Sequence, residues 1–199
     1  MKIIGITGPT GAGKTTALRA LTSLGACIID ADAVYHRLLE ESASLREALI
    51  DRFGDICDGT GGIDRKKLGN VVFTDSAALA ELNAITHRFV GEAIDQLLTG
   101  AEASGCPAAA IDAIALVESG LGERCDAVVG VIAPAEVRIR RIMAREGISE
   151  EYARKRVSAQ KGEDFFRANC DYVLENTEDD TPETFGERAL VLFTEILDH

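Results

Sequence analysis

Five short apolar runs stand out along the chain, at residues 2–7, 26–30, 108–112, 127–132 and 170–176. Most of them are nearly continuous in apolar residues, which is typical of parallel strands that are covered on both faces. Longer stretches with apolar residues at helical spacing lie between them. The pattern predicts an α/β fold in which helices flank a five-stranded parallel sheet.

Helical spacing dominates residues 33–100, where leucine, isoleucine, valine and phenylalanine recur every three or four positions. A glycine-rich turn at residues 57–62 interrupts the pattern and is predicted to be a plain loop. The whole segment is longer than a single crossover helix requires. We therefore expect an insertion of extra helices between the second and third strands, as the place where an acceptor binds.

Two helices are predicted after the fourth strand, one at residues 134–145 and one that is capped by Ser149 and runs to Gln160. A glycine turn joins them, and we expect the pair to move as a lid. A closing helix begins at Pro182. The chain is interpreted as a single domain with a core (about residues 1–32, 101–133 and 168–199), a helical insertion (about 33–100) and a lid (about 134–167).

The composition fits one globular domain of 199 residues, of which 46% are hydrophobic and 27% charged. The formal net charge of −12 argues against nucleic acid and anionic membranes as partners, because both need a basic face. No CxxC or HExxH motif occurs, so we expect reduced cysteines, a cytosolic protein and no structural metal. No apolar stretch approaches the length of a membrane span. The cysteines are Cys27, Cys57, Cys106, Cys125 and Cys170.

Residues 8–15 read GPTGAGKT and match the phosphate-loop pattern GxxxxGK[ST] directly after the first apolar run. The glycines let the backbone turn tightly, so that successive N–H groups and the start of the next helix face phosphate oxygens. Lys14 is expected to neutralise the β- and γ-phosphates, and the Thr15 hydroxyl to hold Mg²⁺. The motif predicts a nucleoside-triphosphate site and the phosphate-loop NTPase fold. We assign to this site Gly8, Gly11, Ala12, Gly13, Lys14, Thr15 and Thr16.

Acidic residues end two of the predicted strands: Asp30 and Asp32 close the second, and Asp112 closes the third. The carboxyl ends of parallel strands form the ligand crevice of an open α/β sheet, so these acids are expected on the phosphate-loop side. Asp112 resembles the acid that holds the magnesium shell in phosphate-loop proteins. At each position the alternative is an aspartate that only caps the next helix or turn.

Arg138, Arg141 and Arg145 are spaced at i, i+3 and i+7, which places them on one stripe of the first lid helix. Residues 138–167 contain nine lysines and arginines against five acids, a local surplus of four positive charges. Distant surface charges are largely screened at physiological salt, so this segment acts as a cationic patch despite the net charge. The stripe is a candidate clamp on the triphosphate, and a solvated helix face is the alternative.

Several segments occur in a characteristic order and spacing: residues 8–16, 29–32, 62–68, 71–73, 82–87 and 141–145, Gln160 and residues 171–176. Together they resemble the dephospho-coenzyme A kinase family, which is related to the nucleoside monophosphate kinases. The chain departs from the family pattern at Arg88, where a proline usually follows the histidine. It departs again at residues 112–118, which read DAIALVE where Asp-x-Pro-Leu-Leu-x-Glu is usual. Both stretches lie near the acceptor site in the family.

The resemblance implies a kinase that transfers the γ-phosphoryl group of ATP, with Mg²⁺, to the ribose 3′-hydroxyl of dephospho-CoA. The products would be CoA and ADP, in the last step of coenzyme A biosynthesis. Asp32 matches the base that accepts or orients the hydroxyl proton, while Lys14, magnesium on Thr15 and Arg141 would stabilise the transferred group. Further contacts are expected from Arg138 and Arg145 to ATP, and from Asp32, Arg65, Lys66, Lys67, His87, Asp112 and Glu118 to the acceptor.

Two other functions stay open at this point. A nucleotide-driven switch would share the phosphate loop, but the chain has no Asn-Lys-x-Asp guanine-reading motif. In addition, Asp112 is followed by Ala113 rather than by a glutamate that could activate water. Another nucleoside or nucleotide kinase would share both the loop and the helical insertion.

Overall fold

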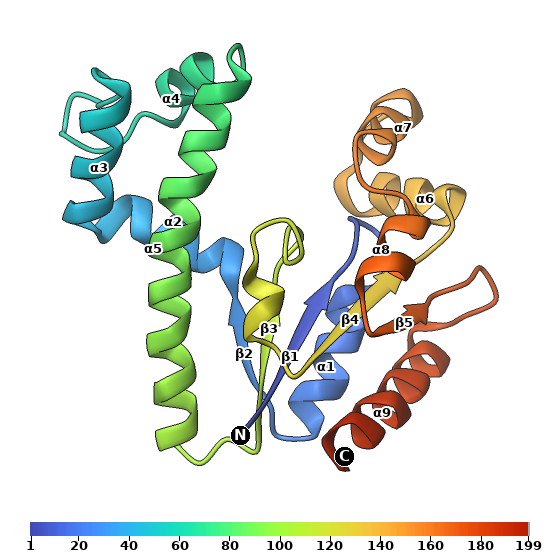
Figure 1. Cartoon of the computed structure of the whole chain (residues 1–199). Helices are drawn as coiled ribbons and strands as arrows, with labels where there is room; N and C mark the ends of the chain where they lie inside the picture. Colours follow the sequence, from blue (N-terminus) through green and yellow to red (C-terminus); the bar gives the residue numbers. More distant parts are fainter. Residues whose placement is uncertain (199) are drawn as a thin grey trace. The chain divides into compact units, whose positions relative to one another are not determined.

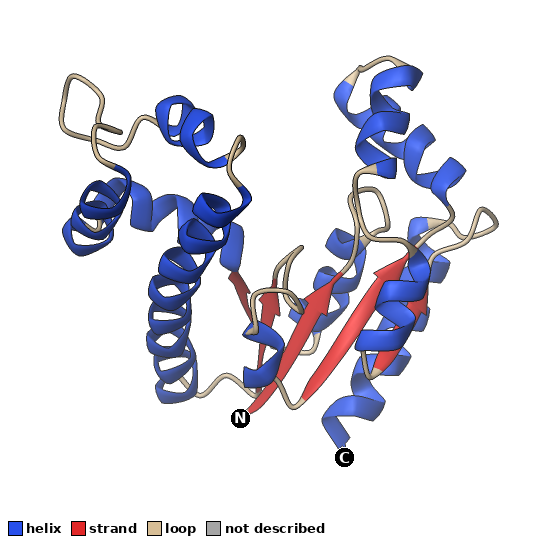
Figure 2. Cartoon of the chain, turned by 45° about the horizontal axis from the view of Figure 1, so that its top comes forward, coloured by secondary structure: helices blue, strands red, loops and turns tan. Residues whose placement is uncertain are grey.

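The computed structural model describes residues 1–198 and contains one five-stranded sheet, made of β1 (Lys2–Thr7), β2 (Cys27–Asp30), β3 (Ala108–Asp112), β4 (Ala127–Ile132) and β5 (Tyr172–Glu175). The strands lie in the order β2-β3-β1-β4-β5. β1 pairs in parallel with both β3 and β4, and β4 pairs in parallel with β5. The predicted α/β fold with a five-stranded parallel sheet is therefore confirmed (Figures 1 and 2).

Helices cover both faces of the central strands, among them α1 (Lys14–Ser23), α8 (Glu163–Asn169) and α9 (Pro182–Asp198). α1 and α9 pack side by side, and their apolar side chains share one buried cluster with Ile4 of β1 and Val129 of β4 (Figure 1). Side chains alternate between the faces of a strand, so Gly130 points to the opposite face. A Cβ on Gly130 would lie 3.2 Å from Cβ of Phe166 in α8. This close approach lets α8 pack directly on β4.

The helix pair expected after the fourth strand consists of α6 (Ala135–Glu146) and α7 (Glu150–Ser158). Gly147 ends α6 with a φ of 66°, and the Ser149 hydroxyl caps α7 by accepting from the N–H of Tyr152 at 3.3 Å. Apolar side chains hold the two helices together. They are Ile139, Ile142, Ala153 and Val157, with Met143 and Ile148 beside them. The movement of this pair as a lid stays a prediction.

The chain divides into two compact units, Met1–Ile29 with Gly100–His199 and Asp30–Thr99. The second unit contains α2 (Ala31–Glu41), α3 (Ala43–Phe53), α4 (Arg65–Val72) and most of α5 (Ser76–Ala103). It has a core of its own, formed by Leu39, Leu45, Leu49, Ile56, Leu68, Val72 and Ala78. An extra helical unit thus follows the second strand, and its role in binding an acceptor stays a prediction.

Short polar side chains start the helices of the second unit. Asp30 caps α2, since its Oδ1 accepts from the N–H of Ala33 at 2.9 Å. Asp64 caps α4 in the same way, with the N–H of Lys66 at 2.9 Å and that of Lys67 at 3.1 Å. The capping alternative therefore holds for Asp30.

Within residues 1–198, no helix combines the length and apolar character that a bilayer span requires.

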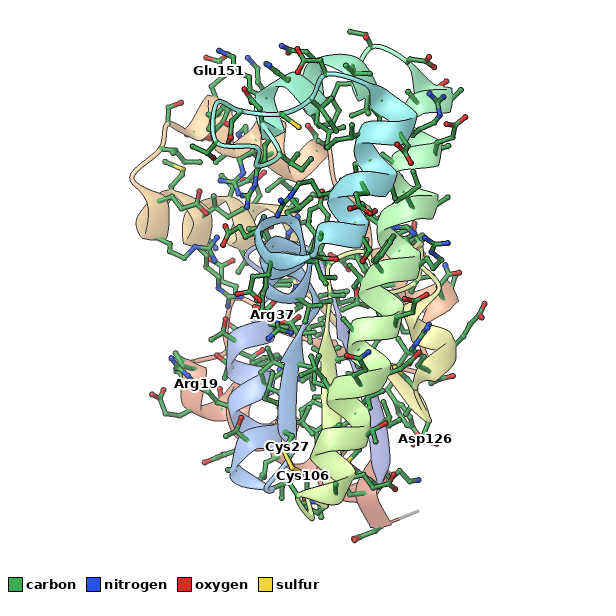
Figure 3. All side chains as sticks on the ribbon, turned by 90° about the vertical axis from the view of Figure 1, so that its left-hand side faces the viewer. Arg19, Cys27, Arg37, Cys106, Asp126 and Glu151 are labelled. Carbon is green, nitrogen blue, oxygen red and sulfur yellow. A yellow bond between two sulfur atoms is a disulfide. The ribbon has the colours of Figure 1, made fainter. Side chains whose placement is uncertain are left out.

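The expectation that every cysteine is reduced is wrong for two of them. Cys27 and Cys106 form a disulfide, with Cα atoms 6.2 Å apart (Figure 3). Cys27 begins β2 and Cys106 precedes β3, the strand beside it, so the parallel order of the strands brings the two side chains together. The partners are 79 positions apart, which is why no local motif indicated the pair. Cys57, Cys125 and Cys170 are free thiols.

Replacing both Cys27 and Cys106 by serine should lower the free energy of unfolding by about 2–4 kcal/mol, because the link no longer restricts the unfolded chain. Urea unfolding of the oxidised protein measures this difference, with Cys57→Ser as a control that removes a free thiol. In a phosphine reductant the double variant and the unsubstituted chain should unfold alike. If the double variant were less stable by the same amount under reduction, the lost stability would not come from the disulfide, and the prediction would be wrong.

Candidate active site

The phosphate loop lies between β1 and α1, and glycine makes its tight path possible. Gly8 has a φ of 145° and Gly13 a φ of 111°, a range that residues with side chains rarely adopt. A Cβ on Gly8 would lie 2.1 Å from the carbonyl oxygen of Val131, and one on Gly13 would lie 2.3 Å from Nδ2 of Asn176. Both distances are far inside van der Waals contact. Only glycine therefore fits where the loop packs against β4 and against the end of β5.

The first turn of α1 presents free hydrogen-bond donors. No side chain caps this helix at Gly13. The N–H groups of Thr16 and Ala17 donate to the Gly13 carbonyl, while those of Gly13, Lys14 and Thr15 have no acceptor in the described part of the chain. Uncapped donors at the positive end of the helix dipole form an anion-binding site. The loop thus has the donors that the phosphate-loop motif predicts.

A pocket of about 380 Å³ opens on this loop, lined by Thr10, Gly11, Gly13, Lys14 and Thr15 among others. Asp112, at the end of β3, lines the same pocket and pairs with Lys14, with 3.4 Å between Nζ and Oδ1. The predicted position of Asp112 at the phosphate-loop side of the sheet is therefore observed. Arg141 and Arg145 of α6 complete the lining, so the pocket brings together three of the predicted cations and one predicted acid.

The arginine stripe of α6 divides into two parts. Arg141 and Arg145 line the pocket, and Arg145 is exposed and pairs with Glu146 at 2.6 Å. Arg138 is buried instead, and its Nε donates to the carbonyl oxygen of Thr10 at 3.0 Å. Burial lowers the pKa of the Arg138 guanidinium. The alternative of a solvated helix face does not hold for Arg138, and its contact with ATP stays a prediction.

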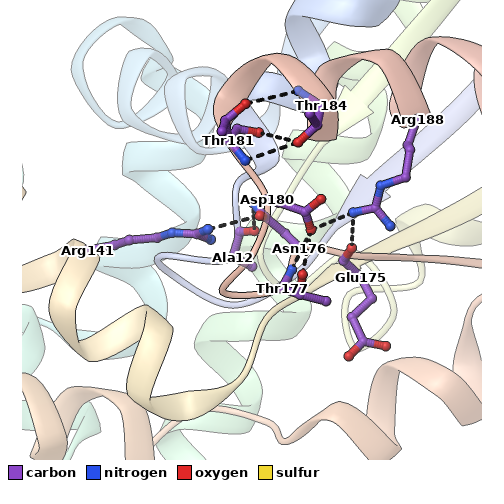
Figure 4. A network of polar contacts seen from close by, with 9 residues as sticks. All are labelled: Ala12, Arg141, Glu175, Asn176, Thr177, Asp180, Thr181, Thr184 and Arg188. Carbon is purple, nitrogen blue, oxygen red and sulfur yellow. Dashed lines mark hydrogen bonds and ion pairs between the residues drawn. The ribbon is translucent and has the colours of Figure 1, made fainter.

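Two side chains that were not predicted as site residues, Gln160 and Asn176, contact this arginine stripe. The Gln160 side-chain oxygen accepts from Arg138. Asn176, which follows β5, accepts from Arg141 at 2.9 Å and donates to the carbonyl oxygen of Ala12 at 2.9 Å (Figure 4). Uncharged amides have neither a charge pattern nor a spacing that marks a site. The one signal for them was their place in segments that resemble the kinase family.

A second pocket, of about 340 Å³, adjoins the first, since Pro9 and Ile114 line both. Glu118 and Lys161 are among its other lining residues, and Glu118 is exposed. The Thr7 hydroxyl donates to the carbonyl oxygen of Ile114 at 3.0 Å and so fastens this segment to the end of β1. The stretch that departs from the family pattern therefore borders the phosphate-loop pocket.

Five predicted acceptor contacts belong to the second unit and are described within it, among them Asp32, Arg65 and His87. Asp32 is exposed in the first turn of α2, and no side-chain hydrogen bond or ion pair engages it among residues 1–198. Arg65 begins α4 and pairs with Glu40 at 3.5 Å. His87 is half-buried on α5, and burial lowers its pKa. Asp30 rather than Asp32 therefore caps α2, and a role of Asp32 in catalysis stays a prediction.

The residues at the loop fit a magnesium ion that is bound together with a triphosphate. Mg²⁺ in such sites is held largely by phosphates and water, with one or two protein oxygens. The Thr15 hydroxyl is exposed at the loop, and the Asp112 carboxylate lines the same pocket. Among the described residues, no three or more histidine, cysteine, aspartate or glutamate side chains lie close enough together to hold a metal ion by themselves.

Comparisons with known proteins agree with one another. A family model described as dephospho-CoA kinase matches residues 2–181. A dephospho-CoA kinase of Geobacter sulfurreducens is 37% identical over 189 residues, which cover 94% of this chain and 95% of that protein. Another, of Corynebacterium diphtheriae, is 37% identical over 178 residues, which cover 89% of each chain. The crystal structure of TT1252 from Thermus thermophilus is similar at a TM-score of 0.81 and 35% identity, over 98% of this chain and 97% of that chain.

The substitution Gly13→Ala should raise the Kd for MgATP at least about tenfold. The new Cβ would collide with the Asn176 side chain, and alanine rarely adopts the positive φ of this position. Isothermal titration calorimetry measures this Kd. Gly100→Ala is the matched control, since Gly100 lies inside α5 and an added methyl group would point into open space. It should leave the Kd unchanged and stabilise the helix by up to about 1 kcal/mol. Unchanged MgATP binding by Gly13→Ala would contradict this account of the loop.

Proposed function

Since the chain belongs to the dephospho-CoA kinase family, we propose that it transfers the γ-phosphoryl group of ATP to the ribose 3′-hydroxyl of dephospho-CoA. The products are CoA and ADP. The observation that carries the proposal is the family match over residues 2–181, which includes both the phosphate loop and the second unit. We further propose that the reaction is the last step of coenzyme A biosynthesis and takes place in the cytosol. This location rests on the family match and no longer on reduced cysteines, since Cys27 and Cys106 form a disulfide.

On the donor side, the N–H groups of the loop and the Lys14 ammonium hold the phosphates of ATP. Phosphoryl transfer passes through a loose transition state that spreads charge over three equatorial oxygens, so alignment and positive charge are the main contributions of the protein. Arg141 and Arg145, which line the loop pocket, supply that charge. Thr15 and Asp112 would hold Mg²⁺, which would supply further positive charge against the phosphates.

On the acceptor side, Asp32 accepts or orients the proton of the 3′-hydroxyl. Support for this role comes from its exposed carboxylate, which has no other partner among the described residues. The proposed contacts to the diphosphate or the adenine of the acceptor are Arg65, Lys66 and Lys67 at the start of α4, and His87 of α5. Closure of α6 and α7 would exclude water, which otherwise competes as the acceptor.

The rate of ADP release with and without dephospho-CoA tests the proposed function. A kinase releases ADP only when the acceptor is present, whereas a nucleotide-driven switch hydrolyses ATP without it. Thermal shifts with dephospho-CoA, AMP, CMP and dTMP separate the proposed acceptor from those of other nucleotide kinases. Acceptor-independent ADP release, or a stabilising shift by another nucleotide and not by dephospho-CoA, would overturn the proposal.

The substitution Asp32→Asn should lower turnover by about 10²–10⁴-fold, because the amide cannot take up the hydroxyl proton. The Kd for MgATP should stay within about threefold of the unsubstituted value, since Asp32 does not contact the donor in this account. Steady-state kinetics and titration calorimetry measure the two effects. Asp51→Asn, at an exposed position of α3, is the control and should leave both unchanged. Near-normal turnover of the Asp32 variant would remove it from the chemistry.

A further inference from the structure

Three consecutive carbonyl oxygens of the phosphate loop accept hydrogen bonds from side chains outside the loop. Arg138 Nε donates to Thr10 at 3.0 Å, Arg141 Nη1 to Gly11 at 3.3 Å, and Asn176 Nδ2 to Ala12 at 2.9 Å. The donors come from α6 and from the residue after β5, far from the loop in sequence. Three successive peptide groups of the loop are thus hydrogen-bonded through their carbonyls to side chains from elsewhere in the chain.

The donors are also paired with one another, which fixes their own orientation. Arg138 donates to the side-chain oxygen of Gln160, and Gln160 Nε2 donates to the Thr10 hydroxyl at 2.9 Å. Arg141 Nη2 donates to Asn176 Oδ1 at 2.9 Å (Figure 4). Arg138 and Arg141 of α6 are thus each hydrogen-bonded both to a loop carbonyl and to one amide side chain. We call these the Arg138–Gln160 pair and the Arg141–Asn176 pair.

Burial makes these contacts hard for water to replace. The side chains of Arg138 and Asn176 belong to residues that are only 4% and 5% exposed. A buried polar group that loses its partner cannot exchange it for solvent, so the cost of the lost hydrogen bond is large. Breaking these hydrogen bonds would therefore cost more than breaking ones that water can replace.

Because the peptide bonds are trans, hydrogen bonds to the loop carbonyls also set the direction of the loop N–H groups. The C=O of one residue and the N–H of the next point in opposite directions. Fixing the carbonyls of Thr10 and Ala12 therefore fixes the N–H groups of Gly11 and Gly13 on the other side. Neither N–H has an acceptor within residues 1–198, whereas the N–H of Ala12 closes the turn on Pro9 at 3.2 Å.

We propose that the Arg138–Gln160 and Arg141–Asn176 pairs are positioning residues that hold the loop N–H groups ready for the nucleotide phosphates. Arg138 then acts through the loop backbone, and Asn176 acts both on the loop and on Arg141. The inference rests on the proposed use of ATP as the donor. It adds Gln160 and Asn176 to the residues on which ATP binding depends, although neither lines the loop pocket with Lys14.

The binding test uses Gln160→Met and Asn176→Ala, with MgATP titrated calorimetrically in the absence of an acceptor. Each variant should raise the Kd for MgATP at least about tenfold, the change expected for one lost hydrogen bond to a charged or buried group. Arg140→Met and Asn169→Ala are matched controls, because Arg140 pairs with Glu178 at the surface and Asn169 donates only to its own helix. The controls should keep the unsubstituted Kd.

Backbone ¹⁵N relaxation of the ligand-free protein separates positioning from general stability. The amide order parameters of Gly11 and Gly13 should be about 0.85 in the unsubstituted chain and fall below about 0.6 in the two variants, while those of β4 stay unchanged. Rigid Gly11 and Gly13 amides, or an unchanged Kd, in a folded variant would overturn the inference and leave the kinase assignment intact. If Asn176→Ala does not fold, Gln160→Met decides alone. Failure of the unsubstituted chain to bind MgATP would overturn the proposed function as well.

Discussion

The direction of a few peptide groups in the phosphate loop is the constraint on which the rest of the structure depends. A loop that turns its N–H groups toward an anion must turn its carbonyls into the protein, where each needs a donor. Arg138, Arg141 and Asn176 supply those donors. The central place of β1 between β3 and β4 makes this possible, because it seats the loop between the end of β3 and the helix after β4.

Charge is arranged to serve the same loop. The chain carries a net charge of −12 and yet must bind a strongly anionic donor. Its cations at the loop are therefore local: Lys14, Arg141 and Arg145 line one pocket. Arg138 is buried behind them and donates to two neutral oxygens, those of the Thr10 carbonyl and of Gln160. A buried charge is tolerated only when hydrogen bonds replace its water, so this arginine and the loop backbone depend on each other.

Local patterns predicted much of the fold and of the donor site. The apolar runs at residues 2–7, 108–112 and 127–132 coincide with β1, β3 and β4, because strands covered on both faces must be apolar throughout. The phosphate loop could also be predicted, since its glycines and Lys14 lie within one motif at residues 8–15. Features that depend on tertiary contacts could not be predicted in this way. Spacing placed Arg138 and Arg141 on one face of α6 but did not indicate that Arg138 is buried, and the Cys27–Cys106 disulfide joins residues 79 positions apart.

The most direct test of the account follows the phosphoryl group itself. The protein is incubated with Mg²⁺, dephospho-CoA and ATP that is labelled at its γ-phosphate. The labelled products are then separated and identified by mass spectrometry. We expect the label to move to the acceptor, whose mass should rise by one phosphoryl group located on the ribose 3′-oxygen. Label recovered as inorganic phosphate, with the acceptor unchanged, would contradict it.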